Sequence, residues 1–252
     1  MIFLRHTMKP ANIDGIYKNQ SALLICNGPS VNTLDPCQID RPGIITMGVN
    51  NGAHIVRPHL WCSQDEPQKF MPSIWQDPRI MKFTRRCRRK DIVDGKLLAN
   101  APAMFYHKLN SGVDPATWLD QESISWAAPS GDKHRVTIFL CALCVLYKLG
   151  FRQIAIVGAD FKMTETPYFF SEHKSRDGIR SNNELFRIIN DFCYKLRPEL
   201  ENRGVSVVNC TPNSGLTAFQ KEDLEDWLSR WSIDISGSTY GMYENKPKIS
   251  VK

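Results

Sequence analysis

The sequence lacks the long apolar runs and short signatures that would classify a protein at once. None of the 252 residues lies in an uninterrupted apolar run of eighteen, so no membrane span is expected. The opening Met1-Ile2-Phe3-Leu4 is too short for a signal sequence, and Arg5 follows it directly. Neither GxGxxG nor GxxxxGK[ST] is present, which excludes the usual dinucleotide and P-loop fingerprints. There is also no internal repeat and no low-complexity tract.

Composition predicts a globular α/β protein. Hydrophobic residues make up 42% of the chain and charged residues 23%, and 32 basic against 26 acidic residues leave a net charge of +6. We expect one domain over residues 1–231, with an irregular lead-in over 1–20, and a polar tail over 232–252.

The eight cysteines are scattered, and several lie in apolar runs, which is typical of a reducing cytosol. We therefore expect a cytoplasmic protein, in the host cytoplasm if it is viral. The pair Cys141-x-x-Cys144 has no second pair and no nearby histidine, so no metal site is predicted there.

The most informative stretch is an apolar strand, Ala22–Ile25, that runs into Asn27-Gly28-Pro29-Ser30. Glycine and proline end the strand, and Ser30 is a suitable N-cap for a following helix. A strand, a tight turn and a helix N-terminus together can hold a phosphate group. The alternative is an ordinary strand–helix turn.

Further buried strands also end in polar residues. The runs 43–49, 59–63, 154–157 and 205–208 lead to Asn50, Asp65, Asp160 and the turn at Asn213. An apolar helix over 136–149 ends at Gly150, and amphipathic helices are expected over 182–203 and 217–231. This alternation predicts a mainly parallel sheet flanked by helices, Rossmann-like and GT-A-like. Because ligands bind at the carboxyl ends of such strands, Asn27, Asn50 and Asp65 should share one crevice.

Six cations occur in nine residues from Lys82 to Lys90, including Arg85, Arg86, Arg88 and Arg89. Such a run suits a phosphate-bearing partner, and the alternative is a solvated loop. The aromatic, charged stretch 162–180 is expected to be a small lid that carries His173, which can exchange protons near neutral pH. A surface histidine is the alternative there.

The order of these motifs resembles the family 42 sialyltransferases. Ile25–Ser30 is similar to their nucleotide loop, Met47–Asn50 to their second strand, and Ser130-Gly131 with Ile156–Phe161 to their later blocks. Cys210–Ser214 resembles their Cys-Pro-Asn-Ser turn. The loop also resembles that of a related group containing archaeal hydroxymethylpterin diphosphokinases and motility accessory glycosyltransferases.

The resemblance implies roles for individual residues. His173 would be the general base and Tyr168 a lid tyrosine at the acceptor. It implies nucleotide binding by the residues that match the family's blocks: Asn27, Gly28, Pro29, Ser30, Asn50, Ser130, Gly131, Asp160 and Asn213. It also implies that no metal is required; Mg²⁺, held by Asp65, is the alternative.

We therefore expect a glycosyltransferase that uses a CMP- or UDP-linked sugar donor. The cations predict a polyanionic acceptor, either DNA with hydroxymethylated bases, as in some viruses, or an anionic glycan. The alternatives are a Mg²⁺-dependent, diphosphokinase-like phosphotransferase and a non-catalytic nucleotide- or nucleic-acid-binding protein. No sequence feature indicates an oligomer.

Overall fold

The computed structural model of the chain describes residues 3–5, 7–111, 115–120, 124–126, 137–164 and 175–240. Its centre is a ten-stranded sheet in which every pairing from β14 to β9 is parallel, while β1 and β2 add an antiparallel edge. The expected mainly parallel α/β fold is thus confirmed. In sheet order the strands are β14 (Gln220–Lys221), β13 (Ser206–Asn209), β12 (Gln153–Val157), β3 (Ser21–Ile25), β4 (Ile44–Val49), β5 (Leu60–Cys62), β6 (Met81–Arg85), β9 (Met104–His107), β1 (Phe3–Leu4) and β2 (Pro10–Ala11).

Two small sheets stand apart from the central one. They are β7 (Ile92–Val93) with β8 (Lys96–Leu97), antiparallel, and β10 (Leu109–Ser111) with β11 (Ile124–Trp126), parallel. The helices are α1 (Pro36–Ile39), α2 (Pro72–Gln76), α3 (Pro115–Trp118), α4 (Ile138–Leu149), α5 (Arg176–Asn202) and α6 (Leu224–Trp231). Five 3₁₀ turns complete the described elements: η1 (Pro29–Thr33), η2 (Asn50–His54), η3 (Pro67–Lys69), η4 (Arg86–Lys90) and η5 (Leu98–Asn100).

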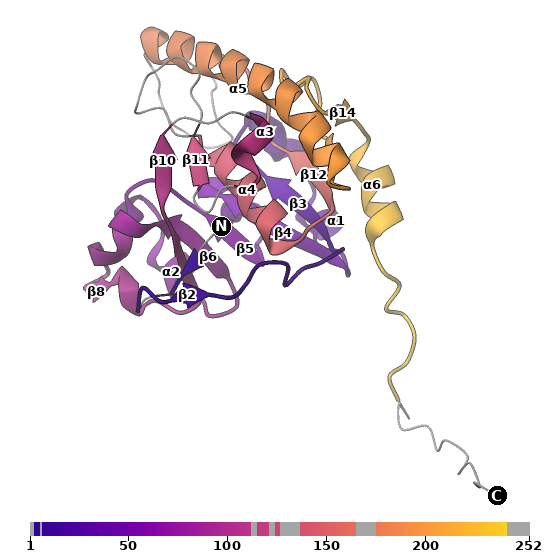
Figure 1. The fold of residues 1–252 in the computed structure, drawn as a ribbon. Helices are drawn as coiled ribbons and strands as arrows, with labels where there is room; N and C mark the ends of the chain where they lie inside the picture. Colours follow the sequence, from indigo (N-terminus) through magenta and orange to yellow (C-terminus); the bar gives the residue numbers. More distant parts are fainter. Residues whose placement is uncertain are drawn as a thin grey trace, which may run out of the picture.

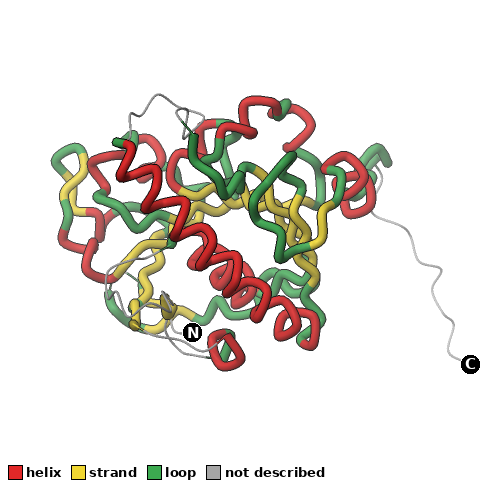
Figure 2. The backbone as a smooth tube through the Cα atoms, turned by 90° about the horizontal axis from the view of Figure 1, so that it is seen from above, coloured by secondary structure: helices red, strands yellow, loops and turns green. Residues whose placement is uncertain are grey.

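Helices cover both faces of the sheet (Figure 1). Alternate side chains of the strands point to opposite faces, so β3 contributes Leu24 to one core and Leu23 to the other. α4 and α5 pack in the core that contains Leu24, and α6 packs with Leu23 through Trp227. Figure 2 shows α5 as one long helix that runs across the molecule.

α4 forms because its sequence is apolar on all sides and has a defined stop at each end. Nine of its twelve residues are buried, and the hydroxyl of Thr137 caps the first turn by accepting from Leu140 N. Gly150 closes the helix with φ +101°, a conformation that favours glycine. No described helix is both long and apolar enough to cross a bilayer: α4 has only twelve residues, and α5 is amphipathic.

The chain order creates a crevice beside β3. After β3 the chain builds β4, β5 and β6 on one side, and it later returns to place β12 on the other side of β3. Loops that leave the carboxyl ends of strands at such a reversal diverge, and open α/β sheets bind their ligands there. The ends of β3, β4 and β12 are therefore the place to look for a site.

Several boundaries differ from those expected. The lead-in over 1–20 contains the edge strands β1 and β2, whose two-residue length leaves no periodicity in the sequence. The helix expected at Ser30 is only the five-residue turn η1, and Gly28 stands at its N-cap position. α5 starts at Arg176, so the end of the predicted lid, 176–180, is helical. α6 starts at Leu224 because Asp223 caps it, and β14 occupies part of the stretch expected to be helical.

Candidate functional site

A cavity of about 630 Å³ opens at the carboxyl edge of the sheet, beside β3. Three strand ends contribute to it: 26–28 after β3, 49–51 at the end of β4, and 158–163 after β12. The start of α4 (137–139) and one side of α5, through Asn182 and Phe186, form another wall, while Asp65, Lys69 and Phe70 complete the lining. This volume is in the range of sites for small organic ligands and cofactors.

Two asparagine side chains at this edge have unused hydrogen-bonding capacity. Asn27 Oδ1 and Asn50 Oδ1 are buried and have no hydrogen-bond partner within the part of the chain that the structure describes. Both residues line the cavity, and Asn50 adopts φ +46°, with its carbonyl accepting from Trp61 Nε1 at 2.7 Å. A buried acceptor without a donor lowers the stability of the fold, so we expect a bound ligand to donate hydrogen bonds to these oxygens. Hydroxyl and amino groups of a nucleoside or sugar are donors of this kind.

The loop that carries Asn27 is fastened to the loop after β12. Asp160 Oδ2 accepts from Ser30 Oγ at 2.7 Å, and Gly28 N donates to Gly158 O at 2.7 Å. A Cβ on Gly28 would overlap the Asp160 carboxylate and lie 2.6 Å from Gly158 O. The glycine is therefore needed for loop-to-loop packing, in addition to any approach by a ligand. Burial, helped by the Asp160 charge, raises the pKa of the neighbouring Cys26 thiol to about 12.

The turn after β13 supports this arrangement from behind. Thr211 Oγ1 accepts from Ala159 N at 3.1 Å, Ser214 Oγ donates to Ala159 O, and Gly215 N donates to Asp160 O at 2.7 Å. Asn213 itself is exposed and is not among the cavity residues; its carbonyl accepts from Lys162 Nζ at 2.8 Å. The turn thus holds the loop after β12, and Asn213 reaches the site only through Lys162.

An aromatic wall faces the polar strand ends. The ring of Phe161 stacks on Phe186 of α5, with centroids 5.0 Å apart, and meets the edge of Phe139 of α4 at 5.2 Å. All three residues line the cavity. Aromatic faces of this kind suit a base or the apolar face of a sugar ring.

The cavity carries both signs of charge. Lys69 and Lys162 can meet a phosphate, while Asp65 and Asp160 are acidic. Asp65 is exposed, and within the described ranges no group of three or more His, Cys, Asp and Glu residues could hold a metal ion. Of the two acidic residues in the cavity lining, Asp160 is engaged with Ser30, and Asp65 is exposed. Asp65 is therefore the acidic side chain that could bind a metal ion there.

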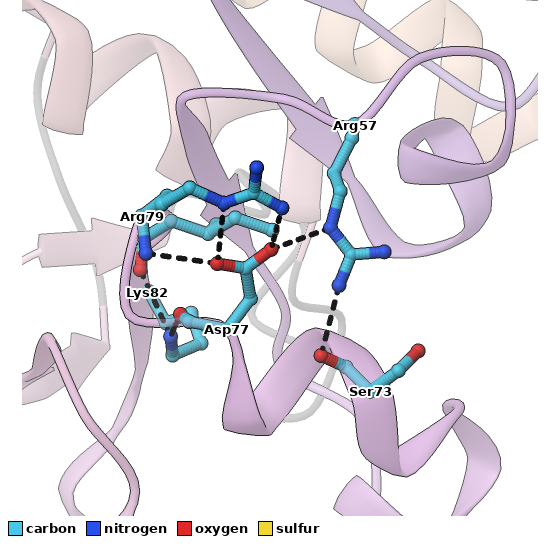
Figure 3. Close-up of polar contacts among 6 residues, drawn as sticks. Arg57, Ser73, Asp77, Arg79 and Lys82 are labelled. Carbon is cyan, nitrogen blue, oxygen red and sulfur yellow. Dashed lines mark hydrogen bonds and ion pairs between the residues drawn. The ribbon is translucent and has the colours of Figure 1, made fainter.

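The basic run predicted to bind a polyanion is largely engaged within the fold. Lys82 is fully buried, and its Nζ donates to the carbonyls of Asp77 and Ile80 at 2.6 and 2.9 Å (Figure 3). Arg57 and Arg79 hold the carboxylate of Asp77, which keeps the pKa of Asp77 well below its usual range. Burial lowers the pKa of Lys82 to about 8. Lys82 is thus a core residue, contrary to the expectation that it belongs to a cationic surface.

Arg85, Arg88 and Arg89 of the run have contacts of their own, and no arginine of the run lines the cavity. Arg85 donates through Nε and Nη2 to the carbonyl of Gln64, and Arg88 pairs with Asp91 at 3.3 Å. Arg89 is half-buried, and Arg86 is exposed. Within this run, Arg86 and Lys90 are therefore the exposed cations.

A buried polar cluster next to the cavity fixes α4 to the sheet. Gln64 Nε2 lies 2.9 Å from His107 Nε2 and donates to Cys141 Sγ at 3.2 Å. Burial, together with the charge of Arg85, lowers the pKa of His107 to about 3. His107 is therefore neutral at physiological pH and too weak a base to accept a proton from an acceptor hydroxyl.

Of the predicted site residues, Asn27, Gly28, Asn50, Asp65 and Asp160 come together around one cavity. Pro29 and Ser30 lie in η1 behind the lining, where Ser30 serves the loop contact. Four predicted residues lie outside the described residues: Ser130, Gly131, Tyr168 and His173.

The sequence reasoning missed Lys69, Lys162, Asn182 and the aromatic wall. Looking for polar residues at strand ends does not identify Lys69, which lies in the turn η3, or Asn182, which lies in α5. The i, i+3, i+4 set Asn182, Leu185 and Phe186 on α5 was the available signal, since it places a polar residue on an apolar face.

Comparison with known proteins gives fold-level likeness only. No protein-family model and no curated protein matches the chain. Among solved structures, it is similar to the sialyltransferase CstII from Campylobacter jejuni in complex with a substrate analogue, cytidine-5'-monophosphate. That match has 11% identity and a TM-score of 0.47, and it covers 82% of this chain and 86% of the other. A tyrosine-to-phenylalanine variant of Cst-II in complex with CMP has 13% identity and a TM-score of 0.44, with 81% and 87% covered. Similarity at this level does not decide a function, which must be argued from the cavity itself.

Proposed function

We propose that the protein is a nucleotide-sugar-dependent glycosyltransferase. The observation that supports this most is a pair of buried amide oxygens, Asn27 Oδ1 and Asn50 Oδ1, at a cavity of about 630 Å³ beside β3. Neither oxygen has a hydrogen-bond partner among the described residues. These oxygens suit the hydroxyl or amino donors of a nucleoside, and the stacked Phe161 and Phe186 suit its base. The cavity has room for a nucleotide with a sugar attached.

The chemistry requires stabilisation of the leaving nucleotide. When the bond at the anomeric carbon breaks, the departing phosphate gains negative charge, and nearby cations stabilise it. Lys69 and Lys162 are the cavity cations that can serve this purpose. A CMP- or UDP-linked donor without a required metal is the finer part of the proposal; Asp65 would supply an oxygen ligand if Mg²⁺ takes part.

The acceptor side of the proposal rests on residues identified in the sequence. His173 would remove the proton of the acceptor hydroxyl, Tyr168 would contact the acceptor, and Ser130 and Gly131 would contact the nucleotide. Replacing His173 with Ala should lower turnover by roughly 10²–10⁴-fold with little change in nucleotide affinity. A variant with the parent's turnover would remove His173 from the mechanism.

The direct test is nucleotide release from a panel of nucleotide sugars and ATP, with and without Mg²⁺. We expect CMP or UDP release without added metal, with Asn27→Ala and Asn50→Ala each binding the nucleotide at least tenfold more weakly. Asn202→Ala is the matched control, because Asn202 is exposed at the end of α5. AMP release that requires Mg²⁺ would show a phosphotransferase instead, and tight binding without turnover would show a non-catalytic protein.

For the acceptor, the proposal keeps the polyanion classes expected from the sequence, DNA or an anionic glycan. Because Arg85 and Arg88 have internal partners, the test variant should replace the exposed Arg86 and Lys90 with Ser. Binding of duplex DNA that weakens steeply with salt, with a flatter slope in this variant, would support a DNA acceptor. Absence of salt-sensitive DNA binding at low ionic strength would leave anionic glycans as the acceptor class.

A further inference from the structure

A small hairpin beside the cavity exposes aliphatic side chains together with cations. β7 and β8 are joined by Asp94 and Gly95, both with positive φ, which makes a tight two-residue turn. Ile92 and Leu97, paired across the hairpin, are 56% and 46% exposed. Met71 follows η3, the turn that contacts β7, and is 72% exposed. We call Met71, Ile92 and Leu97 the apolar tip; the hairpin (β8) stands at the left edge of Figure 1.

The hairpin is firmly attached to the fold, so its exposure is not a sign of poor packing. Val93 and Leu98 are buried in the core that contains Trp61 and Tyr106. Gln68 Nε2 donates to Ile92 O at 3.0 Å, and Leu98 N donates to Asp91 O at 2.8 Å. A rigid element that presents large aliphatic side chains to solvent is typical of an interaction surface.

The charge around the apolar tip is strongly positive. The segment 85–97 holds six cations and only two acidic residues, Asp91 and Asp94, and Asp91 pairs with Arg88. Arg86, Lys90 and Lys96 are exposed. Each exposed Lys or Arg held near an anionic lipid surface adds about fivefold to binding.

We propose that this surface docks the protein onto an anionic lipid bilayer. Aliphatic side chains and cations on one surface favour a bilayer as the partner. Aliphatic side chains are stabilised at the boundary between headgroups and acyl chains, and the cations contact the lipid phosphates. Duplex DNA is bound by cations alone, and single-stranded nucleic acid adds aromatic stacking; neither partner accounts for the exposed aliphatic side chains of the apolar tip. Because Gln68 lies in the same turn as Lys69, which lines the cavity, docking would bring that cavity wall close to the lipid headgroups.

The test is flotation of the full chain with vesicles of phosphatidylcholine alone and of phosphatidylcholine containing about one third phosphatidylserine. We expect binding to the anionic vesicles only, weakening with salt. Ile92→Ser with Leu97→Ser should reduce binding at least tenfold, and Arg86→Ser with Lys90→Ser and Lys96→Ser should reduce it by a similar or greater factor. Ile16→Ser, at a residue that is 48% exposed on another segment, is the matched control.

Hydrogen exchange of the parent provides a measurement that does not depend on variants. The amides of Ile92–Leu97 should become protected when anionic vesicles are added. No binding to anionic vesicles, or equal binding by the apolar-tip variant, would overturn the proposal. So would salt-sensitive binding of duplex DNA without vesicle binding, or a dimer that the apolar-tip variant converts to a monomer. Nucleotide release from the sugar donor enters none of these outcomes, so the donor chemistry proposed above is tested separately. Salt-sensitive binding of duplex DNA would assign the exposed Arg86 and Lys90 to the acceptor and not to a bilayer.

Discussion

Asp160 links the two loops that form the floor of the cavity, and its role can be separated into position and charge. Its carboxylate accepts from Ser30 Oγ at 2.7 Å, but its negative charge also faces a site proposed to bind phosphate. Asp160→Asn keeps the acceptor oxygen and removes the charge, so we expect CMP or UDP affinity equal to or above the parent's. Asp160→Ala loses the contact and should bind about tenfold more weakly, as for loss of a hydrogen bond to a charged group. Calorimetry would decide, and equal weakening by both variants would contradict a positioning role.

Gly28 illustrates what the sequence could not reveal at the residue scale. The sequence suggests that Gly28→Val would block a ligand and leave the fold intact. The structure contradicts this, because even a Cβ would overlap the Asp160 carboxylate and approach Gly158 O to 2.6 Å. We therefore expect Gly28→Ala to lower the free energy of unfolding by about 1–3 kcal/mol, the range for overpacking. Urea unfolding would measure it; Gly237→Ala, where nothing lies within 4 Å, is the control and should unfold like the parent.

At the scale of single elements, α4 offers a direct test of capping. The Thr137 hydroxyl accepts from Leu140 N at 3.2 Å, and the first turn of this buried helix forms part of the cavity wall. Thr137→Ala should destabilise the protein by about 1 kcal/mol, whereas Thr137→Ser keeps the cap and should lose less. Chemical unfolding at neutral pH checks both, and equal losses would assign the effect to the lost methyl group instead.

Elements were predictable where burial leaves a pattern in the sequence. The sequence predicts α4 over 136–149, and the helix runs from Ile138 to Leu149. The prediction is close because the helix is one apolar run that stops at Gly150. The start of α5 was missed because its first turn holds Arg176, Asp177 and Gly178, none of which is apolar enough to extend the helical period. The cap itself, Ser175 Oγ accepting from Gly178 N at 3.1 Å, was the only local signal.

At the scale of the molecule, the position of the site was predictable because the chain's topology decides it. Asn27, Asn50 and Asp160 follow strands that turn out to be neighbours, and the order β12–β3–β4 places their ends around one cavity. The sequence prediction for Lys82 is wrong because it rests on local composition and not on topology. Six cations in nine residues indicate a surface in the sequence, but both faces of β6 are covered, so Lys82 is buried together with Phe83 and Thr84.

The buried thiols make the stability of the whole molecule depend on pH in the alkaline range. Burial raises the pKa of Cys26, Cys144 and Cys210 to about 12 and also raises the pKa of Cys141 and Cys193. Their contribution to stability is complete below the unfolded thiol pKa of about 8.5 and is lost as the pH rises toward the folded values. Lys82 acts in the opposite direction: its pKa is lowered to about 8, so it favours folding as the pH rises from 8 toward 10.5.

Five thiols outweigh one lysine, so the free energy of unfolding should fall steeply above pH 8.5. Each thiol contributes at most about 1.4 kcal/mol per pH unit to this slope. Cys193→Ala should make the fall of the unfolding free energy with pH shallower by the contribution of one thiol, whatever its effect on stability at pH 7. Lys82→Met should make that fall steeper. The measurement is urea unfolding at pH 8, 9 and 10 with a reductant present. Cys37→Ala is the control, since Cys37 is exposed and its loss should leave the slope unchanged. A stability that is flat from pH 8 to 10 would show that the thiols are not buried as the structure has them.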